Sequence, residues 1–253
     1  RASASFAWRA SPRAKGRAGP VRLLTQYPFG IDGDVQAKRF VTQYNSDLAN
    51  DLGNLVSRVT KMIMADFDGK LPQPYRNIEE LDQLMLLTEQ LPDAAYSHIK
   101  HFRLTNAIAD SLNVVRAANK FFNDAAPWQL RKAGEIDKQG GVLYACCEVL
   151  RIVATILYPV MPNKMKEIRT VLGLDDSTLT LVHAREFFDL VPGTTIQLDQ
   201  PVFPRIEGTF APSAPEQLAA KKPNLAPTDD NLLDIADFQK AELRVAQVIT
   251  AER

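Results

Sequence analysis

The sequence contains little cysteine and little histidine. Its 253 residues include two cysteines and three histidines, and the cysteines are adjacent, at positions 146 and 147. Neighbouring residues of a helix point in directions about 100° apart, so Cys146 and Cys147 can form neither an unstrained disulfide with each other nor a metal clamp alone. This pattern predicts structural cysteines in a reduced, intracellular protein, which we place in the cytoplasm.

Long apolar runs and an excess of one charge are also missing. The longest apolar stretch, residues 149–161, contains Arg151 and Pro159 and is shorter than the roughly 18 residues of a membrane span. We therefore expect a soluble protein with no membrane partner. The 30 basic and 30 acidic side chains give a formal net charge of zero. Any surface for a nucleic acid would consequently have to be local.

His98 and His101 are one helical turn apart, a spacing that suits a metal ion. No Asp, Glu or Cys joins them at ligand spacing in the sequence, and two imidazoles alone do not complete a metal site. We interpret them as a solvated pair and expect no metal site.

The two ends of the chain differ from its middle. Residues 1–20 are rich in Arg, Ala and Ser and contain no acidic residue, which fits an organelle transit peptide or a disordered, non-native piece. Residues 208–231 read as a Pro/Ala/Lys linker. Residues 232–253 predict a capped turn and the first strand of a truncated module, too short to fold alone. Because the sequence begins with Arg1, we expect a fragment of a longer protein.

The middle of the chain predicts an all-α bundle after a short strand (Val21–Thr25) and a turn-rich loop. Apolar residues recur every three or four positions, and the expected helices cover residues 35–67, 77–102, 104–124, 142–158 and 163–172. Extended pieces are expected at residues 195–198 and 202–206.

Several residues are expected to begin or end these helices. Asp34 should cap the first helix and Asn77, with Glu80 in a capping box, the second. Pro92 should break the second helix or begin its continuation. The pair Gly140-Gly141 should open the fourth, nearly all-apolar helix, and Gly173 should end the fifth.

The first helix carries a polar face that suits a nucleic acid. Its buried seam is expected at Tyr44, Leu48, Leu52, Leu55, Val59 and Met62. Asn54 and Arg58 lie one turn apart beside this seam, where an amide and a planar guanidinium suit the edges of unstacked bases. The alternative is a solvated face held by a charge lattice between Asp51 and Arg58.

Trp128 follows Pro127, which fixes the backbone before it, and precedes Arg131 and Lys132. An indole on a rigid turn beside cations can serve as a stacking platform for a base. The alternative is a core aromatic that covers a helix end.

Five stretches in register resemble the C-terminal half of the methionyl-tRNA synthetases. They are Tyr27–Asp34, Asn45–Leu55 with Arg58, Ala118–Lys120 running on to Ala126–Trp128, Leu157–Pro162 and Pro201–Glu207. Residues 237–246 are similar to the start of the tRNA-binding OB-fold module that many bacterial members append after a linker.

The resemblance implies a helical anticodon-binding domain of class I aminoacyl-tRNA synthetases at residues 35–207, preceded at 21–34 by the end of the catalytic region. It implies that the partner is tRNA(Met) and that Asn54, Arg58, Pro127 and Trp128 read the CAU anticodon. Trp128 would stack on one splayed base while Asn54 and Arg58 bond to base edges. Because Asn54, Arg58 and Trp128 all match family positions, the resemblance favours anticodon reading over the structural alternatives given above for these side chains.

The resemblance also implies what this chain lacks. The family's catalytic half, with its His-Ile-Gly-His-like and Lys-Met-Ser-Lys-Ser motifs for ATP, has no counterpart, and neither do the zinc-binding cysteines of some members. We expect the parent to ligate methionine to tRNA(Met) with ATP and magnesium during translation. This chain should bind tRNA without catalytic residues or a cofactor. Because the appended module dimerises in related proteins, the parent can be a homodimer and the truncated chain should be a monomer.

Two other interpretations stay open. The leucine and cysteine enzymes share the class I helical bundle, although Asn54, Arg58 and the Pro127-Trp128 pair argue against them and tRNA preference would decide. A helical scaffold that binds proteins predicts instead that these side chains are not needed for any RNA affinity.

Overall fold

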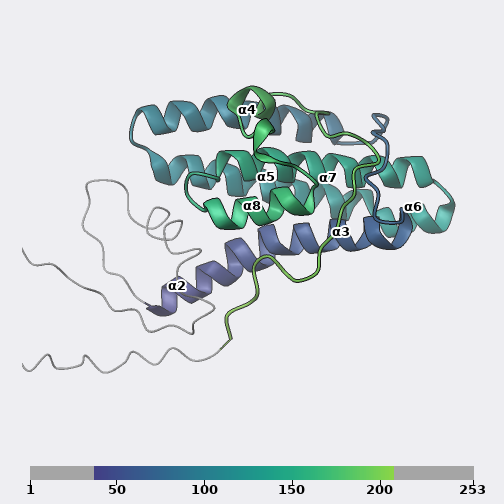
Figure 1. Ribbon diagram of the computed structural model, residues 1–253, viewed down its shortest axis with the longest axis horizontal. Helices are drawn as coiled ribbons and strands as arrows, with labels where there is room; N and C mark the ends of the chain where they lie inside the picture. Colours follow the sequence, from purple (N-terminus) through teal and green to yellow (C-terminus); the bar gives the residue numbers. More distant parts are fainter. Residues whose placement is uncertain (1–36, 208–253) are drawn as a thin grey trace, which may run out of the picture. The chain divides into compact units, whose positions relative to one another are not determined.

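Residues 37–207, the part of the chain that the computed structural model describes, fold into helices and connecting segments (Figure 1). In chain order the helices are α2 (Ala37–Gln43), η1 (Tyr44–Gly53), α3 (Asn54–Asp66), α4 (Leu81–Lys100), α5 (Leu104–Ala125), α6 (Pro127–Ala133), α7 (Ile136–Ile156), α8 (Pro162–Val171), η2 (Asp176–Thr178) and α9 (Leu181–Ala184). No strand forms between residues 37 and 207, which confirms the all-α class there. The predicted strand at 21–25, the Asp34 cap and the OB-fold start at 232–253 lie outside the described residues.

Helix α7 forms the centre of the bundle. Every residue from Gln139 to Ile156 is buried, and α7 contacts α3, α4, α5, α6, α8 and α9. In Figure 1, α4 lies at the top and α2 and α3 at the bottom, with α5 and α7 between them. By length and composition α7 could cross a membrane, but its apolar window is entirely buried in the bundle. An apolar surface on all sides is what a central helix needs.

The first predicted helix is a continuous helical rod from Ala37 to Asp66, but its middle is not α-helical. Residues Tyr44–Gly53 form the π-helix η1 between α2 and α3. The predicted seam is confirmed at Tyr44, Leu48, Leu52, Leu55 and Val59, which are all buried, while Met62 is only partly buried. The first three of these residues are each four apart, a spacing that suits the wider turn of a π-helix with i→i+5 bonds.

The segment Pro201–Ile206, which contains one of the two predicted extended pieces, packs against this rod and forms no strand. Asn45 exchanges two hydrogen bonds with the backbone of Ile206, each of 2.9 Å, and the Tyr44 hydroxyl donates to the Pro204 carbonyl at 3.1 Å. Phe203 lies over Gly53, where a Cβ would come within 3.2 Å of the Phe203 Cβ. The other predicted piece, residues 195–198, bonds to the loop at residues 69–71 with one isolated bridge between Lys70 and Thr195.

The predictions about the start of helix α4 and about Pro92 are wrong. Asn77 does not cap it, because the helix begins at Leu81 after Glu80, which has a left-handed backbone (φ 63°) and no side-chain cap bond. Pro92 neither breaks nor begins a helix but lies inside α4. Proline removes one backbone hydrogen bond there, and burial of Leu91, Pro92 and Ala95 against the bundle offsets that loss.

The glycine pair also has a role different from the predicted one. Helix α7 begins at Ile136, so Gly140 and Gly141 lie in its second turn. A Cβ on Gly141 would lie 2.5 Å from the Tyr75 Cβ, and one on Gly140 would lie 2.9 Å from the Pro72 Cβ. The glycines therefore let the segment before α4 approach the helix closely. Gly173 follows α8 with φ 70°, as the sequence predicts.

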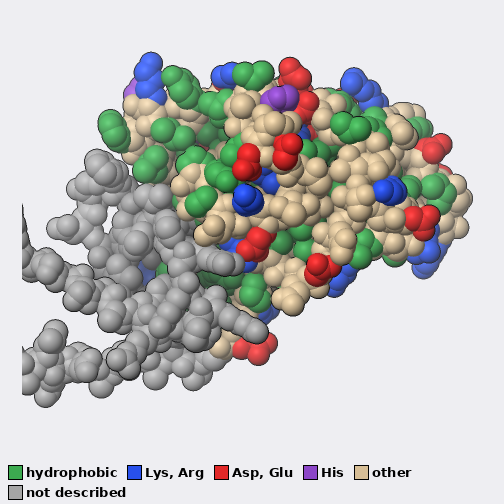
Figure 2. Space-filling model, viewed as in Figure 1, with side chains coloured by type: hydrophobic (Ala, Val, Ile, Leu, Met, Phe, Trp, Pro, Cys, Tyr) green, Lys and Arg blue, Asp and Glu red, His purple; other side chains and the backbone are tan. Residues whose placement is uncertain are grey.

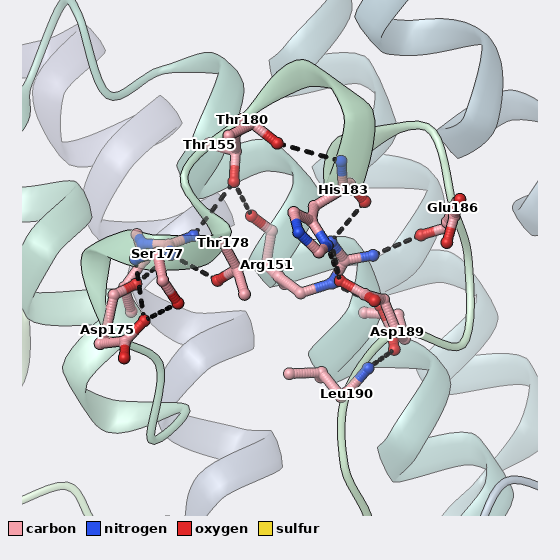
Figure 3. Close-up of polar contacts among 12 residues, drawn as sticks. Arg151, Thr155, Asp175, Ser177, Thr178, Thr180, His183, Glu186, Asp189 and Leu190 are labelled. Atoms are coloured by element: carbon pink, nitrogen blue, oxygen red, sulfur yellow. Dashed lines mark hydrogen bonds and ion pairs between the residues drawn. The ribbon is translucent and has the colours of Figure 1, made fainter.

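A buried ionic network attaches the segment after α8 to α7 (Figure 3). Glu148 and Arg151 are 0% and 1% exposed and pair at 2.7 Å. Arg151 also pairs with Asp189 at 3.3 Å and donates to the carbonyls of His183 and Glu186. Burial raises the pKa of Glu148, and the Arg151 charge opposes that rise. The segment after α8 contains little helix, so many of its backbone groups have no helical partner. Arg151 and Glu148 provide partners for three of them, the carbonyls of His183 and Glu186 and the N–H of Leu190.

Cys146 and Cys147 are buried and free, as the sequence predicts. Burial raises the pKa of the Cys146 thiol to about 12 and that of Cys147 well above its usual value. Thiols that stay protonated are inert, which fits a structural role.

Candidate nucleic-acid interface

Three side chains from three different helices meet at one exposed surface. The Arg58 guanidinium carbon, from α3, lies 4.5 Å from the centre of the Phe122 ring of α5 and 5.8 Å from the Trp128 ring of α6. The two rings lie 6.1 Å apart with their planes tilted by 50°. A guanidinium within about 6 Å of an aromatic face is attracted by the ring quadrupole. The structure therefore brings Arg58 and Trp128 together, although they are far apart in sequence.

The turn between α5 and α6 positions Trp128. Ala126 has a left-handed backbone (φ 42°, ψ 63°) and is shared by the end of α5 and the start of α6. Pro127 follows as the first residue of α6 and is buried, so it sets the turn and presents no open surface of its own. Trp128 packs against Phe122 on one side and stays 37% exposed. It thus partly covers a helix end and still offers indole surface to a ligand.

An open hollow of about 300 Å³ lies beside this indole. Its lining residues are Arg58, Lys61, Met62, Ala65, Asp66, Phe122, Trp128 and Arg131. Arg131 pairs with the Asp66 carboxylate at 2.6 Å, which also accepts a bond from Gln139. Two cations, Arg58 and Lys61, line the hollow in addition to that pair. On the face drawn in Figure 2, acidic and basic side chains are interspersed.

Arg58 does not form the pair with Asp51 that the alternative interpretation of this face required. Its Nη2 donates to Asn123 Oδ1 of α5 at 2.8 Å, whereas Asp51 pairs with Arg116 at 2.9 Å. The charge lattice between Asp51 and Arg58 is therefore not formed. Residues on α5 instead hold the guanidinium from the side and from below.

Asn54 lies one turn before Arg58 and is exposed, as its position beside the seam predicts. It does not line the Trp128 hollow. It opens onto a neighbouring hollow of about 370 Å³, lined by Ala49, Asn50, Gly53, Asn54, Ser57, Pro201 and Phe203. The polar face of the rod thus presents two adjacent openings, one at Asn54 and one at Arg58 and Trp128.

Sequence reasoning missed Phe122 and Asn123 as parts of this site. Phe122 is 1% exposed, and its place on the apolar face of α5 made it look like a core residue only. The position of Asn123 carried no signal at all, since its contact with Arg58 depends on how α5 packs against α3.

Of the histidine pair, His101 is exposed as predicted, whereas His98 is partly buried. His98 Nε2 contacts the Asp110 carboxylate at 3.0 Å, and His101 Nδ1 contacts the Ser97 carbonyl at 2.7 Å. Asp110 was overlooked because it lies on α5, twelve residues from His98. Within residues 37–207 no group of three or more His, Cys, Asp or Glu side chains is arranged to hold a metal ion.

Comparison with known proteins identifies the family of this chain. The family described as the anticodon binding domain of methionyl tRNA ligase matches residues 75–221. The methionine–tRNA ligases of Caldanaerobacter subterraneus subsp. tengcongensis and Thermotoga maritima are 34% and 33% identical to the chain, each over 91% of its length. The chain spans only 36% and 35% of the lengths of these relatives.

Solved structures give the same result. The free form of Mycobacterium tuberculosis methionyl-tRNA synthetase is 32% identical, with a TM-score of 0.70 over 74% of this chain and 38% of that protein. The same enzyme in complex with methionyl-adenylate gives a TM-score of 0.68. These enzymes share the fold of this chain, and the chain belongs to the family of methionyl-tRNA ligase anticodon-binding domains.

Proposed function

We propose that this chain reads the CAU anticodon of tRNA(Met) as the anticodon-recognition part of a methionine–tRNA ligase. The observation that carries the proposal is the meeting of the Arg58 guanidinium and the Trp128 indole at one open hollow. Single-stranded loops are the part of an RNA whose bases can be splayed out, stacked on aromatic rings and bonded at their edges.

Each predicted side chain then has a role that its position supports. Trp128 stacks on one base with the face that Phe122 does not cover. Arg58 and Asn54 bond to base edges, each at its own hollow. Pro127 acts indirectly, because it is buried and holds the turn that presents Trp128. Lys61 supplies charge for the phosphate backbone, which gives affinity without sequence preference.

The activity of the longer protein is part of the proposal. We infer that the parent joins methionine to tRNA(Met) with ATP and magnesium, since the relatives are methionine–tRNA ligases and one solved relative holds methionyl-adenylate. The parent's catalytic part acts on these substrates, and this chain binds tRNA without catalysing. Charging of tRNA with labelled methionine by this chain alone would contradict that division of labour.

The remaining regions fit the same scheme. We propose that residues 35–207 are the anticodon-binding domain, 208–231 a linker and 232–253 the start of a tRNA-binding OB-fold module. The parent then dimerises through the complete module in the cytoplasm, and this chain is a monomer. A dimer that persists on dilution in light scattering would be incompatible with this assignment.

The direct test is filter binding of the chain to tRNA(Met) and to the same tRNA with a changed anticodon, at one fixed salt concentration. Salt must be fixed because phosphate contacts alone shift affinity by orders of magnitude. We expect the CAU form to bind at least about tenfold tighter, and Trp128→Ala to remove most of that difference, since a base stack contributes roughly 1–3 kcal/mol. Equal binding of both tRNAs would favour a protein-binding scaffold instead.

A further inference from the structure

The π-helix η1 is fixed at its beginning by the segment at residues 201–206. Asn45 donates from Nδ2 to the Ile206 carbonyl and accepts from the Ile206 N–H, both at 2.9 Å. The preceding residue, Tyr44, is 8% exposed and bonds to the Pro204 carbonyl. These long-range contacts hold the first turn of η1 against a segment about 160 residues away in sequence.

The other end of η1 is fixed by α5. The Asn119 side chain donates both of its amide hydrogens, one to the Asp51 carbonyl and one to the Val115 carbonyl, each at 3.1 Å. It therefore joins the backbone of the rod to the backbone of α5. Arg116, one turn earlier on α5, pairs with Asp51 and Asp47 at 2.9 and 3.2 Å, but its side chain is 47% exposed.

The Asp51 carbonyl lies where the π-helix ends and α3 begins. It also accepts the backbone N–H of Asn54, the first residue of α3. A π-helix closes i→i+5 bonds where an α-helix closes i→i+4 bonds, and one residue of an α-helix corresponds to a rotation of about 100°. If η1 lost its π geometry while its beginning stayed fixed, Arg58 would rotate away from α5 and Trp128, and Asn54 would rotate away from its own hollow.

Helix α5 also contacts the Arg58 side chain directly. Phe122 and Asn123 contact the Arg58 guanidinium, one turn beyond Asn119. Helix α5 thus contacts the rod at two successive levels, at Asp51 and at Arg58, with Asn54 between them. Loss of the first contact would leave Asn54 without a fixed orientation.

We propose that Asn119 is a positioning residue for anticodon reading: its bond to the Asp51 carbonyl maintains the helical phase that directs Arg58 to Trp128 and Asn54 to the neighbouring hollow. This role rests on the proposed function. It assigns control over sequence discrimination to a part-buried amide that bonds to two backbone carbonyls and lines neither hollow. Affinity for the phosphate backbone is left to the surface cations.

The test uses the 253-residue chain and two RNA hairpins, one with a CAU loop and one with a changed loop, at fixed salt. The readout is the dissociation constant for the changed loop divided by the dissociation constant for the CAU loop, so a higher ratio means stronger discrimination. A loss of folded protein reduces binding of both hairpins equally and does not move this ratio. We expect Asn119→Ala to lower the ratio by about fivefold or more, a typical coupling between separate sites. Asn119→Asp, which has the same shape but no amide donor, is expected to do the same.

The matched control is Arg116→Ala. It removes contacts from the same helix to the same rod residue, Asp51, but leaves the Asp51 carbonyl bonded. Because exposed ion pairs contribute little, the ratio should stay within about twofold of the unmodified chain. Asn45→Ala, at the other end of η1, is expected to lower the ratio as Asn119→Ala does, which gives a second test if Asn119 variants fail to fold.

The two proposals fail in different ways. If the unmodified chain does not distinguish the hairpins, anticodon reading is wrong and the role of Asn119 is wrong with it. If the unmodified chain discriminates and Arg58→Ala abolishes this, but folded Asn119 and Asn45 variants keep the full ratio, only the positioning role is overturned.

Discussion

The Oδ1 atom of Asn123 accepts a hydrogen bond of 2.8 Å from Nη2 of Arg58. The same guanidinium lies over the Phe122 ring, so two consecutive residues of α5 hold it in position and in plane. A planar donor group with one edge fixed can present its remaining N–H donors to a base edge without first losing rotational freedom.

This relationship predicts that lysine cannot replace Arg58. Arg58→Lys keeps the charge but loses the planar contact with Phe122 and the directed bond to Asn123. We expect discrimination between CAU and changed anticodons to fall by roughly 1–3 kcal/mol, while the salt dependence of binding stays the same. Binding titrations at several salt concentrations measure both quantities. Arg58→Ala, the control, removes the guanidinium altogether and should lose at least as much discrimination.

The helices could be predicted where burial alone determines the pattern. The seam from Tyr44 to Val59 and the apolar length of α7 identified the two helices that matter most for the core. Local signals were less reliable. Gly140 and Gly141 suggested a helix start, but tertiary packing against Pro72 and Tyr75 explains them.

The candidate site could be predicted in part. The spacing of Asn54 and Arg58 placed both on one face, and that is where they lie. The approach of Trp128 to Arg58 depends on the left-handed backbone at Ala126, a conformation that alanine rarely adopts and that no sequence rule would assign to it. The contacts of Phe122 and Asn123 follow from the crossing of α3 and α5. The resemblance to a known family supplied the role of Trp128, which residue type alone did not favour.

The buried pair of Glu148 and Arg151 predicts a large loss of stability when one partner is removed. Glu148 accepts bonds from the Tyr144 hydroxyl and the Leu190 N–H as well as from Arg151. In Glu148→Gln the amide N–H₂ would face a donor whichever way it is turned, either Arg151 or the Leu190 N–H, and Asp189, 21% exposed, would be the remaining carboxylate paired with Arg151. We expect the free energy of unfolding to fall by about 3–5 kcal/mol, measured by urea denaturation.

The matched control for that prediction is Arg185→Ala, which removes an ion pair with Asp93 whose side chains are 45% and 67% exposed. Its cost should be below about 1 kcal/mol. Similar losses for the two variants would mean that the buried network does not hold the segment after α8.

Alkaline pH should destabilise the protein through its buried thiols. The pKa of Cys146 is about 12 in the folded chain against an ordinary value of 9.0, so between these values the unfolded chain binds fewer protons. The stability that depends on the protonated thiol is fully present below about pH 9 and is lost as the pH rises toward 12. The free energy of unfolding then falls by up to about 1.4 kcal/mol per pH unit for each such group.

Urea denaturation between pH 8 and about pH 11 measures this decline. The double variant Cys146→Ala, Cys147→Ala is expected to start from a lower stability, because it creates a cavity, but to decline less steeply. Parallel declines for both proteins would show that the thiols are not responsible and would direct attention to Tyr144, whose pKa burial also raises.

Substitution of Gly141 by alanine should destabilise the bundle, although glycine-to-alanine changes inside helices usually stabilise by up to about 1 kcal/mol. The new Cβ would lie 2.5 Å from the Tyr75 Cβ and 2.9 Å from the Tyr75 carbonyl oxygen, and neither atom belongs to a flexible side-chain end. Overpacking of this kind costs about 1–3 kcal/mol, so the clash outweighs the gain in propensity.

The matched comparison is Gly140→Ala in the same turn. Its new Cβ would lie 2.9 Å from the Pro72 Cβ, so this substitution should cost less. Urea denaturation with an unchanged m-value would measure both. A stabilised Gly141→Ala protein would mean that the segment before α4 is not held against α7 and that these glycines serve some purpose other than close approach.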